Sequence, residues 1–503
     1  MPSKLMTPGV YIEEKNAFPS SAVAVETAVP AFIGYTQKAE WNGKSLLAKP
    51  TRISSFAEYV ERFGEAFKAK FTIADPDPKV KQETFSLGGK DKIVKINDKN
   101  TAYLFNAIRL FYANGGGPAY ILSVGTYGDS SAGLEIKADD FIGSADKVDP
   151  FELLKKEFEP TLVVIPDAIF LGEACYTSIY TKVLAHCANM QSRFGIFDLA
   201  NQQPGEDTAA VVGLFRDKIG VNALNYGAAY YPWVKASVVQ PSEVTFENLD
   251  AAVDLEAILP AADEPAAIEV VKNFKKIKTP DDNDKRNYHQ ALRATSPTYN
   301  HILDEIRAKL NELPPSAAMA GLYTTVDNSR GVWKSPANVS VSAVNAPSVN
   351  ISNEGQESLN VDVMAGKSIN VIRSFPGIGT LVWGGRTLDG NSQDWRYINV
   401  RRTLIMIEQS LKLAARAYVF EPNDANTWVT VKSMMVNFLT NLWKQGALAG
   451  SAPEQAFDVQ IGLGATMTPT DILDGKMLIT VKVAIVRPAE FIVITFQQQM
   501  QQS

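Results

Sequence analysis

Apolar runs of strand length alternate with helical segments along the first half of the chain, and this alternation limits the fold more than any other feature. "AVPAFIGYT" is a buried-strand run, "SSFAEYVERFG" has helical spacing with Ser55 as its cap, and "TAYLFNAIRLFYANGGGPAYILSVG" joins a helix, a glycine stop and a strand. "PTLVVIPDA" to "FGIFDLA" repeats the strand, helix and strand order, and "NYGAAYYPWVKAS" adds another strand. This spacing predicts a largely parallel sheet covered by helices, which is an α/β domain beginning near Val25.

The C-terminal part has a different pattern, with two consecutive amphipathic helices followed by two strands. Apolar side chains recur at three- and four-residue intervals, at Leu404, Ile407, Leu411, Ala414 and Tyr418 in the first helix and at Trp428, Val431, Met435, Phe438 and Leu442 in the second. Pro422 prevents continuation of the first helix, Asn423 or Asp424 can cap the second, and Gly446 ends it. Strands over Met477–Val486 and Phe491–Phe496, separated by "RPAE", predict an α+β domain.

Two segments have the composition of surface insertions. Residues 67–100 are polar, turn-rich and lysine-rich, and residues 240–293 have the pattern of charged helices broken by "LPAADEP" and "KTPDDNDKRN". We expect both insertions to lie at the outside of the α/β domain, with a helical structure for the second.

Composition excludes several classes of protein. The 503 residues are 46% apolar and 21% charged, with a net charge of −6, so the chain has no overall basic field for wrapping nucleic acid. The start "MPSKLMTPGV" lacks the apolar core of a secretory signal, and the two cysteines fit a cytoplasmic protein. The longest apolar stretch carries Lys482, Arg487, Pro488 and Glu490, which indicates strands rather than a membrane-spanning helix.

Signals for catalysis or metal binding are weak. None of the three histidines, His186, His289 and His301, stands at a metal-ligand spacing, and the His186–Cys187 pair lies in an apparently buried helix. "AGKS" lacks the first glycine of a phosphate loop, and "GDSSAG" has the wrong spacing for a nucleophile elbow. We expect no cofactor and no metal.

Asp167 is the strongest candidate for chemistry. It follows the strand "LVVIP", and the carboxyl ends of parallel strands are where α/β enzymes place ligands and catalytic groups. The structural interpretation, an aspartate that caps a helix, is favoured. The alternative function is therefore an α/β enzyme that binds a nucleotide or a phosphorylated substrate near Asp167.

A basic stretch occupies the first C-terminal helix and the residues beside it. It comprises Arg401, Arg402, Lys412 and Arg416, with Glu408 the only acidic residue in the helix. Such a stretch is usually a solvated helix face, and the Glu408–Lys412 spacing forms a favourable intrahelical pair. The functional alternative is a docking face for an acidic protein surface.

The segment "TPGVYIEE" near the N-terminus reads as a strand without a partner. Val10, Tyr11 and Ile12 favour a strand, and the residues that follow do not form a clean hairpin. Because a lone short strand is unstable in water, it must add to a sheet elsewhere, either far along this chain or in another chain.

Several motifs together resemble the contractile tail sheath family, which includes phage sheaths and the sheaths of extracellular contractile injection systems. In the C-terminal part these are "FPGIGTLVWGGRTL", "WRYINVRRT", "YVFEPND" and "LWKQGALAGSAPEQAFDV". Upstream, "PGVYIEE", "FYANGGGPAYILSVG" and "GVWKSPAN" match the family pattern in order. The resemblance spans nearly the whole chain except the two insertions.

The resemblance implies a domain organisation in which neighbouring subunits exchange arms. Residues 1–27 would be an N-terminal arm, 28–345 an outer α/β domain, 346–486 an inner α+β domain and 487–503 a C-terminal arm. The arms would donate strands to the inner domains of neighbours through Val10, Tyr11, Ile12 and Glu13 and through Phe491, Ile492, Val493, Ile494, Thr495 and Phe496. Lys15–Thr27 and "RPAE" would be the two hinges.

The function implied is structural and not enzymatic. The chain would form hexameric rings that stack helically around an inner tube and contract to drive the tube through a target envelope. Partners would be neighbouring sheath subunits, the tube, and baseplate and terminal cap proteins, without direct nucleic-acid contact or membrane insertion. Tube contacts are predicted at Arg401, Arg402, Lys412, Arg416 and Lys444. Assembly would take place in the bacterial cytoplasm, giving a phage tail or a tail-like particle that can be released.

Overall fold

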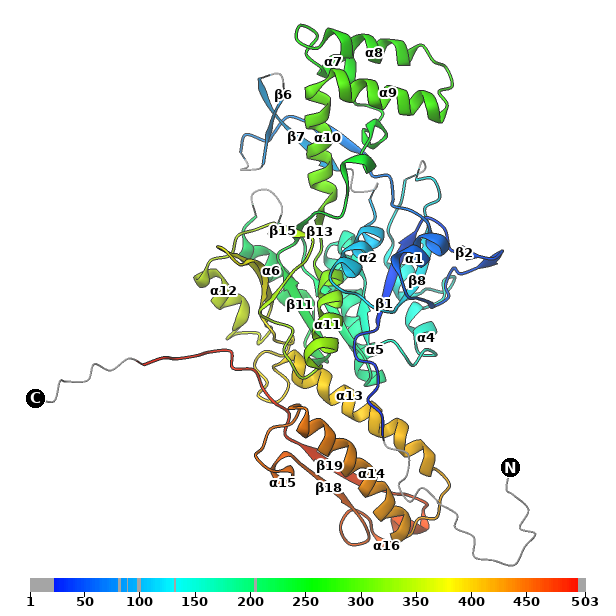
Figure 1. Cartoon of the computed structure of the whole chain (residues 1–503), viewed down its shortest axis with the longest axis vertical. Helices are drawn as coiled ribbons and strands as arrows, with labels where there is room; N and C mark the ends of the chain where they lie inside the picture. The colour runs from blue at the N-terminus through cyan, green and yellow to red at the C-terminus, as the bar shows by residue number, and fades with distance from the viewer. Residues whose placement is uncertain are drawn as a thin grey trace, which may run out of the picture. The chain divides into compact units, whose positions relative to one another are not determined.

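The computed structural model describes residues 22–79, 83–87, 89–96, 101–130, 133–202 and 206–495. They fall into two compact units (Figure 1). The large unit comprises Glu26–Ile405 together with the chain from Arg487 onward, and the small unit comprises Met406–Val486 together with the chain up to Val25. The chain therefore passes from one unit to the other three times.

A nine-stranded sheet forms the centre of the large unit. Its strands lie in the order β14 (Val339–Ser340), β17 (Gly379–Trp383), β16 (Asn370–Phe375), β11 (Gly227–Tyr231), β10 (Phe194–Asp198), β9 (Leu162–Val164), β1 (Pro30–Thr36), β8 (Ala119–Thr126) and β4 (Thr51–Ile53). The run from β16 to β8 is parallel, whereas β14, β17 and β4 are added antiparallel at the two edges. The α/β prediction is confirmed.

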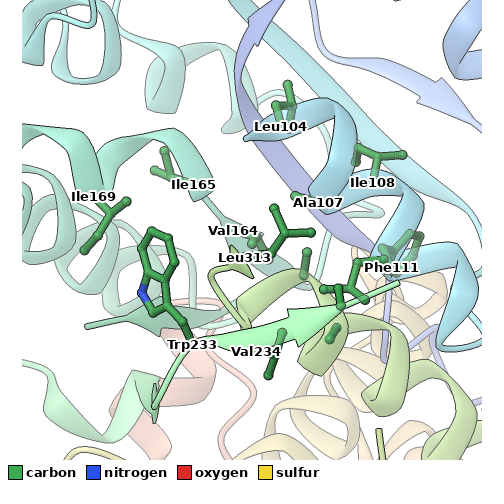
Figure 2. Close-up of a cluster of buried hydrophobic side chains, with 14 of the residues drawn as sticks. Leu104, Ala107, Ile108, Phe111, Val164, Ile165, Ile169, Trp233, Val234 and Leu313 are labelled. Carbon is green, nitrogen blue, oxygen red and sulfur yellow. The ribbon is translucent and has the colours of Figure 1, made fainter. Parts of the chain in front are cut away.

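Helices cover this sheet through apolar faces that follow the sequence pattern. All seven residues of β1 are buried, as expected for a strand covered on both faces. Helix α2 (Leu104–Ala113) packs against β1 and against α11 (Ser316–Arg330). Figure 2 shows Leu104, Ala107 and Phe111 of α2 in one cluster with the buried residues of the neighbouring elements. Gly115, with a φ of +83°, follows the helix and provides the predicted stop.

Buried aspartates at the ends of two adjacent strands cap these same helices. Asp167, just after β9, accepts hydrogen bonds from the backbone N–H groups of Tyr103 and Leu104 at 2.6 and 3.2 Å, at the start of α2. Asp198, at the end of β10, accepts from the backbone N–H of Ser316 at the start of α11 at 2.7 Å. Burial raises the pKa of Asp167 to about 6 and that of Asp198 to about 7, against the opposing effect of these hydrogen bonds.

The two predicted insertions form elements outside the nine-stranded sheet and contact each other, with Phe71 bridged to Leu249. Residues 67–100 contribute a three-stranded sheet of β5 (Phe71–Ala74), β7 (Lys90–Ile96) and β6 (Phe85–Leu87), with Phe71 fully buried. The second segment is helical as predicted and contains α7 (Leu255–Ile258), α8 (Pro265–Lys275) and α9 (Asp282–Thr295), the last two side by side in Figure 1.

Shorter elements complete the large unit. They are α1 (Phe56–Phe63), α3 (Ala138–Ile142), α4 (Pro150–Leu154), α5 (Thr181–Met190), α6 (Thr208–Lys218), α10 (Pro297–Leu310), α12 (Asn353–Asn360), β2 (Glu40–Trp41), β3 (Lys44–Ser45), β12 (Val234–Ala236), β13 (Glu312–Leu313) and β15 (Val344–Pro347). Ser55 caps α1 by accepting from the Glu58 N–H, as predicted.

The small unit contains the second amphipathic helix and a hairpin-like pair of strands. Helix α13 (Ile398–Ala415) leads into it, and α14 (Ala425–Lys444), α15 (Pro453–Ala456), β18 (Phe457–Ile461), α16 (Pro469–Leu473) and β19 (Ile479–Val483) follow. Asp424 caps α14 by accepting from the Thr427 N–H, and Gly446 follows its end with a φ of +85°. The predicted helices and the strand within Met477–Val486 are confirmed.

The division between the units differs from the sequence-based boundary at residue 346. Strands β16 and β17 lie after that boundary but belong to the nine-stranded sheet, and the small unit begins only at Met406. Among the described residues, no helix combines the length and apolar character needed to cross a membrane.

Candidate functional site

Among its described residues, the small unit contains a sheet of two strands. β18 and β19 pair antiparallel over five residue pairs, from Phe457↔Val483 to Ile461↔Ile479. Helix α14 packs against β18, and Val459 is buried. Within the described ranges, no strand pairs with the outer edge of either β18 or β19. Both edges therefore present backbone groups that a further strand can satisfy.

The C-terminal segment has the composition of a strand, but its described residues form none within the single chain. Residues Phe491–Thr495 of the predicted strand are exposed and pair with no other strand. Phe496 lies outside the described residues. The exposed fractions of Phe491, Ile492, Val493 and Ile494 are 72%, 78%, 88% and 70%. The run "FIVITF" has no charge, no proline and no glycine, so it has a high tendency to pair with another strand.

The residues just before this segment are fixed on the large unit. Arg386 forms a bidentate ion pair with Glu490, with Nε–Oε1 and Nη2–Oε2 distances of 2.9 and 2.7 Å. Asn360 Nδ2 donates to the same carboxylate at 2.7 Å, and Tyr397 OH donates at 3.1 Å. We call these four residues the Glu490 clamp. "RPAE" is predicted from the sequence as a break between strands and as the C-terminal hinge, because nothing near Glu490 in the sequence indicates its partners.

Electrostatics show that the clamp holds an ionised carboxylate. Burial raises the pKa of Glu490, but the hydrogen bonds from Arg386, Asn360 and Tyr397 outweigh it, so the pKa is lowered from its usual value. Arg386 is itself 4% exposed. A charged pair at this depth is retained only when its hydrogen bonds are satisfied, and here several donors converge on one carboxylate.

The N-terminal strand candidate lies outside the described residues, including Val10, Tyr11, Ile12 and Glu13. The end of the predicted hinge Lys15–Thr27 is described from residue 22 and is held at two points. The Val25 N–H donates to Ser410 Oγ at 3.0 Å within the small unit. Thr27 Oγ1 donates to Asp327 at 2.6 Å, and its carbonyl accepts from Arg402 at 2.9 Å, within the large unit.

Two of the predicted tube-contacting residues are buried in the large unit. Arg402 is 3% exposed and pairs with Asp327, with an Nη1–Oδ1 distance of 3.0 Å. Arg401 is 4% exposed, and its guanidinium lies 4.6 Å from the ring centres of both Tyr226 and Trp395. These side chains do not reach the surface of the subunit, so this part of the prediction needs correction. A basic sequence does not reveal that its partners are acidic or aromatic residues far away in the chain.

The other three basic residues are on the surface. Lys412 and Arg416 are exposed at the end of α13 and just after it, and Lys444 is exposed at the end of α14. They remain the predicted contacts with the tube.

The alternative site at Asp167 is occupied by structural hydrogen bonds. The side chain is fully buried, and both of its oxygens accept backbone N–H groups, including that of Tyr35 at 3.1 Å. Cys187 is buried, and burial lowers the pKa of His186 to about 3. Within the part of the chain that the structure describes, no three His, Cys, Asp or Glu side chains are grouped to hold a metal ion.

Comparison with known proteins gives the family. Residues 391–499 match the model of the phage tail sheath C-terminal domain. The contracted helical sheath of the anti-feeding prophage is 30% identical, with a TM-score of 0.60 over 98% of this chain and 99% of that one. The chain belongs to the contractile tail sheath family. The contracted sheath complex of an extracellular contractile injection system, PVC, is 28% identical, with a TM-score of 0.61 over 99% of each chain.

Phage sheath proteins match over shorter regions. The tail sheath protein of Vibrio phage KVP40 is 24% identical over 202 residues, which is 39% of this chain and 28% of that protein. The tail sheath protein of Burkholderia phage BcepMu is 30% identical over 142 residues, covering 27% of this chain and 29% of that protein. The chain thus matches less than a third of the length of these phage relatives. The family is structural and not enzymatic, which disfavours the function at Asp167.

Substitution of Arg402 tests its structural role. We expect Arg402→Met to destabilise the large unit by about 3–5 kcal/mol, because it leaves the Asp327 carboxylate buried without its partner. Lys412→Met is the matched control, since an exposed lysine contributes within about 0.5 kcal/mol. Thermal unfolding followed by circular dichroism measures both. Equal melting temperatures for the two variants would contradict a stabilising role for the buried Arg402–Asp327 pair.

Proposed function

We propose that this chain is the structural subunit of a contractile sheath, assembled as helically stacked hexameric rings around an inner tube. In this proposal a trigger at the baseplate releases contraction, and the sheath drives the tube through a target envelope. Support comes from the family relationship and from the similar solved structures, which include a helical sheath in its contracted state and a six-fold symmetrised baseplate.

The observation that carries the proposal is the match between an incomplete sheet and an exposed strand-forming segment in the same chain. β18–β19 has two outer edges available within the described residues, and the chain has two candidate strands, Val10–Glu13 and Phe491–Phe496. One strand added at each edge would give four strands covered by α14. Strand addition supplies directional backbone hydrogen bonds and side-chain pockets at alternate positions.

Donation to other copies explains polymerisation. The donor segments and the acceptor edges are different surfaces of one chain, so the contact is heterologous, and a copy can accept strands from one neighbour while donating its own to another. Such contacts repeat from copy to copy and generate rings or helical filaments. Arms that stay bound while the bodies rotate would keep the sheath connected during contraction.

The energy for contraction would come from a difference in buried surface between two packings of the subunits. A few kcal/mol per subunit is sufficient, and burial of about 100–200 Å² of additional apolar surface supplies that amount. Summed over the many copies of a sheath, this drives the tube without a cofactor or a bond-breaking reaction.

The proposed partners are neighbouring copies, the inner tube, and baseplate and terminal cap proteins. No direct contact with nucleic acid and no membrane insertion are part of the proposal. Assembly would take place in the bacterial cytoplasm, giving a phage tail or a tail-like particle that can be released.

Electron microscopy of the purified chain tests assembly through the arms. We expect stacked rings or tubes from the full chain and single subunits from a variant that lacks residues 1–21. This deletion keeps Val25 and Thr27, whose hydrogen bonds hold the start of the described chain. Truncation after Glu490 should have the same effect. Discrete small particles from the full chain, or tubes from both truncated variants, would contradict the proposal.

Charge reversal tests the tube contact. We expect the triple variant Lys412→Glu, Arg416→Glu, Lys444→Glu to form sheaths alone but to lose co-assembly with the tube protein. Lys432→Glu, an exposed lysine elsewhere on α14, is the control and should co-assemble normally. Co-sedimentation with the tube protein measures co-assembly of the triple variant and of the control. Unchanged co-assembly of the triple variant would rule out Lys412, Arg416 and Lys444 as the contact with the tube.

A further inference from the structure

The Glu490 clamp is prepositioned by the sheet of the large unit. Asn370 on β16 accepts from the backbone N–H of Arg386 at 2.8 Å and donates to its carbonyl, also at 2.8 Å. Asn370 also donates to the carbonyl of Ala229 on β11 at 3.2 Å. Arg386 and Tyr397 face each other in an antiparallel bridge. Two of the donors for Glu490, Arg386 and Tyr397, are therefore held by contacts within the large unit that do not involve the carboxylate.

Glu490 is a fixed point between two less restrained stretches of chain. On one side, the less restrained stretch is residues 487–489, which follow the paired residue Val486, whose N–H donates to the carbonyl of Ala447 at 3.3 Å. An ion pair in this stretch joins Arg487 to Asp394, with an N–O distance of 3.8 Å and both side chains more than half exposed. On the other side, the exposed segment begins at Phe491. An exposed ion pair such as Arg487–Asp394 stabilises the position of the chain only slightly, whereas a buried pair with several hydrogen bonds stabilises it much more. Between Arg487 and the exposed segment, the chain is therefore restrained mainly at Glu490.

We propose that Arg386, Asn360 and Tyr397 position the C-terminal arm by clamping Glu490, so that the arm leaves from the large unit and only residues after Glu490 can reach another copy. This inference rests on the proposed function for its second part, namely that the arm binds another copy. The clamping itself concerns the single chain.

The clamp changes how the arm can transmit motion. With Glu490 held, no hinge lies between the large unit and the predicted donated strand, which follows the fixed point without a linker. The six residues of the predicted donated strand, Phe491–Phe496, can extend at most about 22 Å from Glu490, which limits where the edge that accepts them can lie. Movement of the large unit is then passed directly to the copy that accepts the arm.

Spin labelling tests the clamp in the single chain. Ala489→Cys is exposed, and both native cysteines are buried, so a nitroxide can be attached selectively after Cys175→Ala and Cys187→Ala. We expect a restricted nitroxide spectrum in the parent and a mobile one in Glu490→Gln. The variant Arg386→Met, Glu490→Met removes both charges and should also give a mobile spectrum. Asp394→Asn, which loses only the exposed contact of Arg487, is the matched control and should stay restricted.

Assembly tests the consequence. We expect Glu490→Gln to raise the critical concentration for tube formation roughly fivefold to tenfold, with Asp394→Asn unchanged. A restricted nitroxide in Glu490→Gln would overturn the clamp. A mobile nitroxide with an unchanged critical concentration would overturn its role in positioning the arm. If the parent forms no tubes, the proposed function fails, while the nitroxide spectra still decide whether Glu490 is clamped.

Discussion

Backbone N–H and C=O groups on the outer edges of β18 and β19 have no ladder partner within the described residues, and the rest of the account depends on how they are satisfied. A two-stranded sheet is only marginally stable in water, and unpaired edges recruit other strands. Since α14 already packs against β18, this sheet lacks strands and not a covering layer. A strand from another copy would satisfy the edges and join the copies. It would also explain why the apolar segment from Phe491 stays exposed in one subunit.

Buried arginines hold the chain to the large unit at one residue near each end of the described chain. Arg402 holds the carbonyl of Thr27 and pairs with Asp327, and Arg386 holds Glu490. Charged residues here position the chain, in the same way that Asp167 and Asp198 position helices at the ends of their strands. Asp167, the catalytic candidate, and Arg402, one of the docking candidates, are therefore occupied within the fold.

Local signals in the sequence were sufficient for much of the fold. The parallel sheet, α13 and α14 follow from apolar periodicity, and the caps at Ser55 and Asp424 follow from side chains next to the helices they cap. The burial of Arg402 and the clamping of Glu490 could not be predicted in this way. Their acidic and basic partners lie 75 and 104 residues away, so only the folded chain brings them together. For the same reason, β16 and β17 joined the large sheet across the predicted boundary.

A reconstruction of the assembled tubes by electron cryo-microscopy tests the central claim most directly, because it shows which chain supplies each strand. The account predicts a four-stranded sheet in every small unit, made of β18, β19 and one strand from each of two neighbouring copies, with density continuous from Glu490 of the donor. A sheet that stays two-stranded in the tube, or terminal segments that pair within their own subunit, would contradict it.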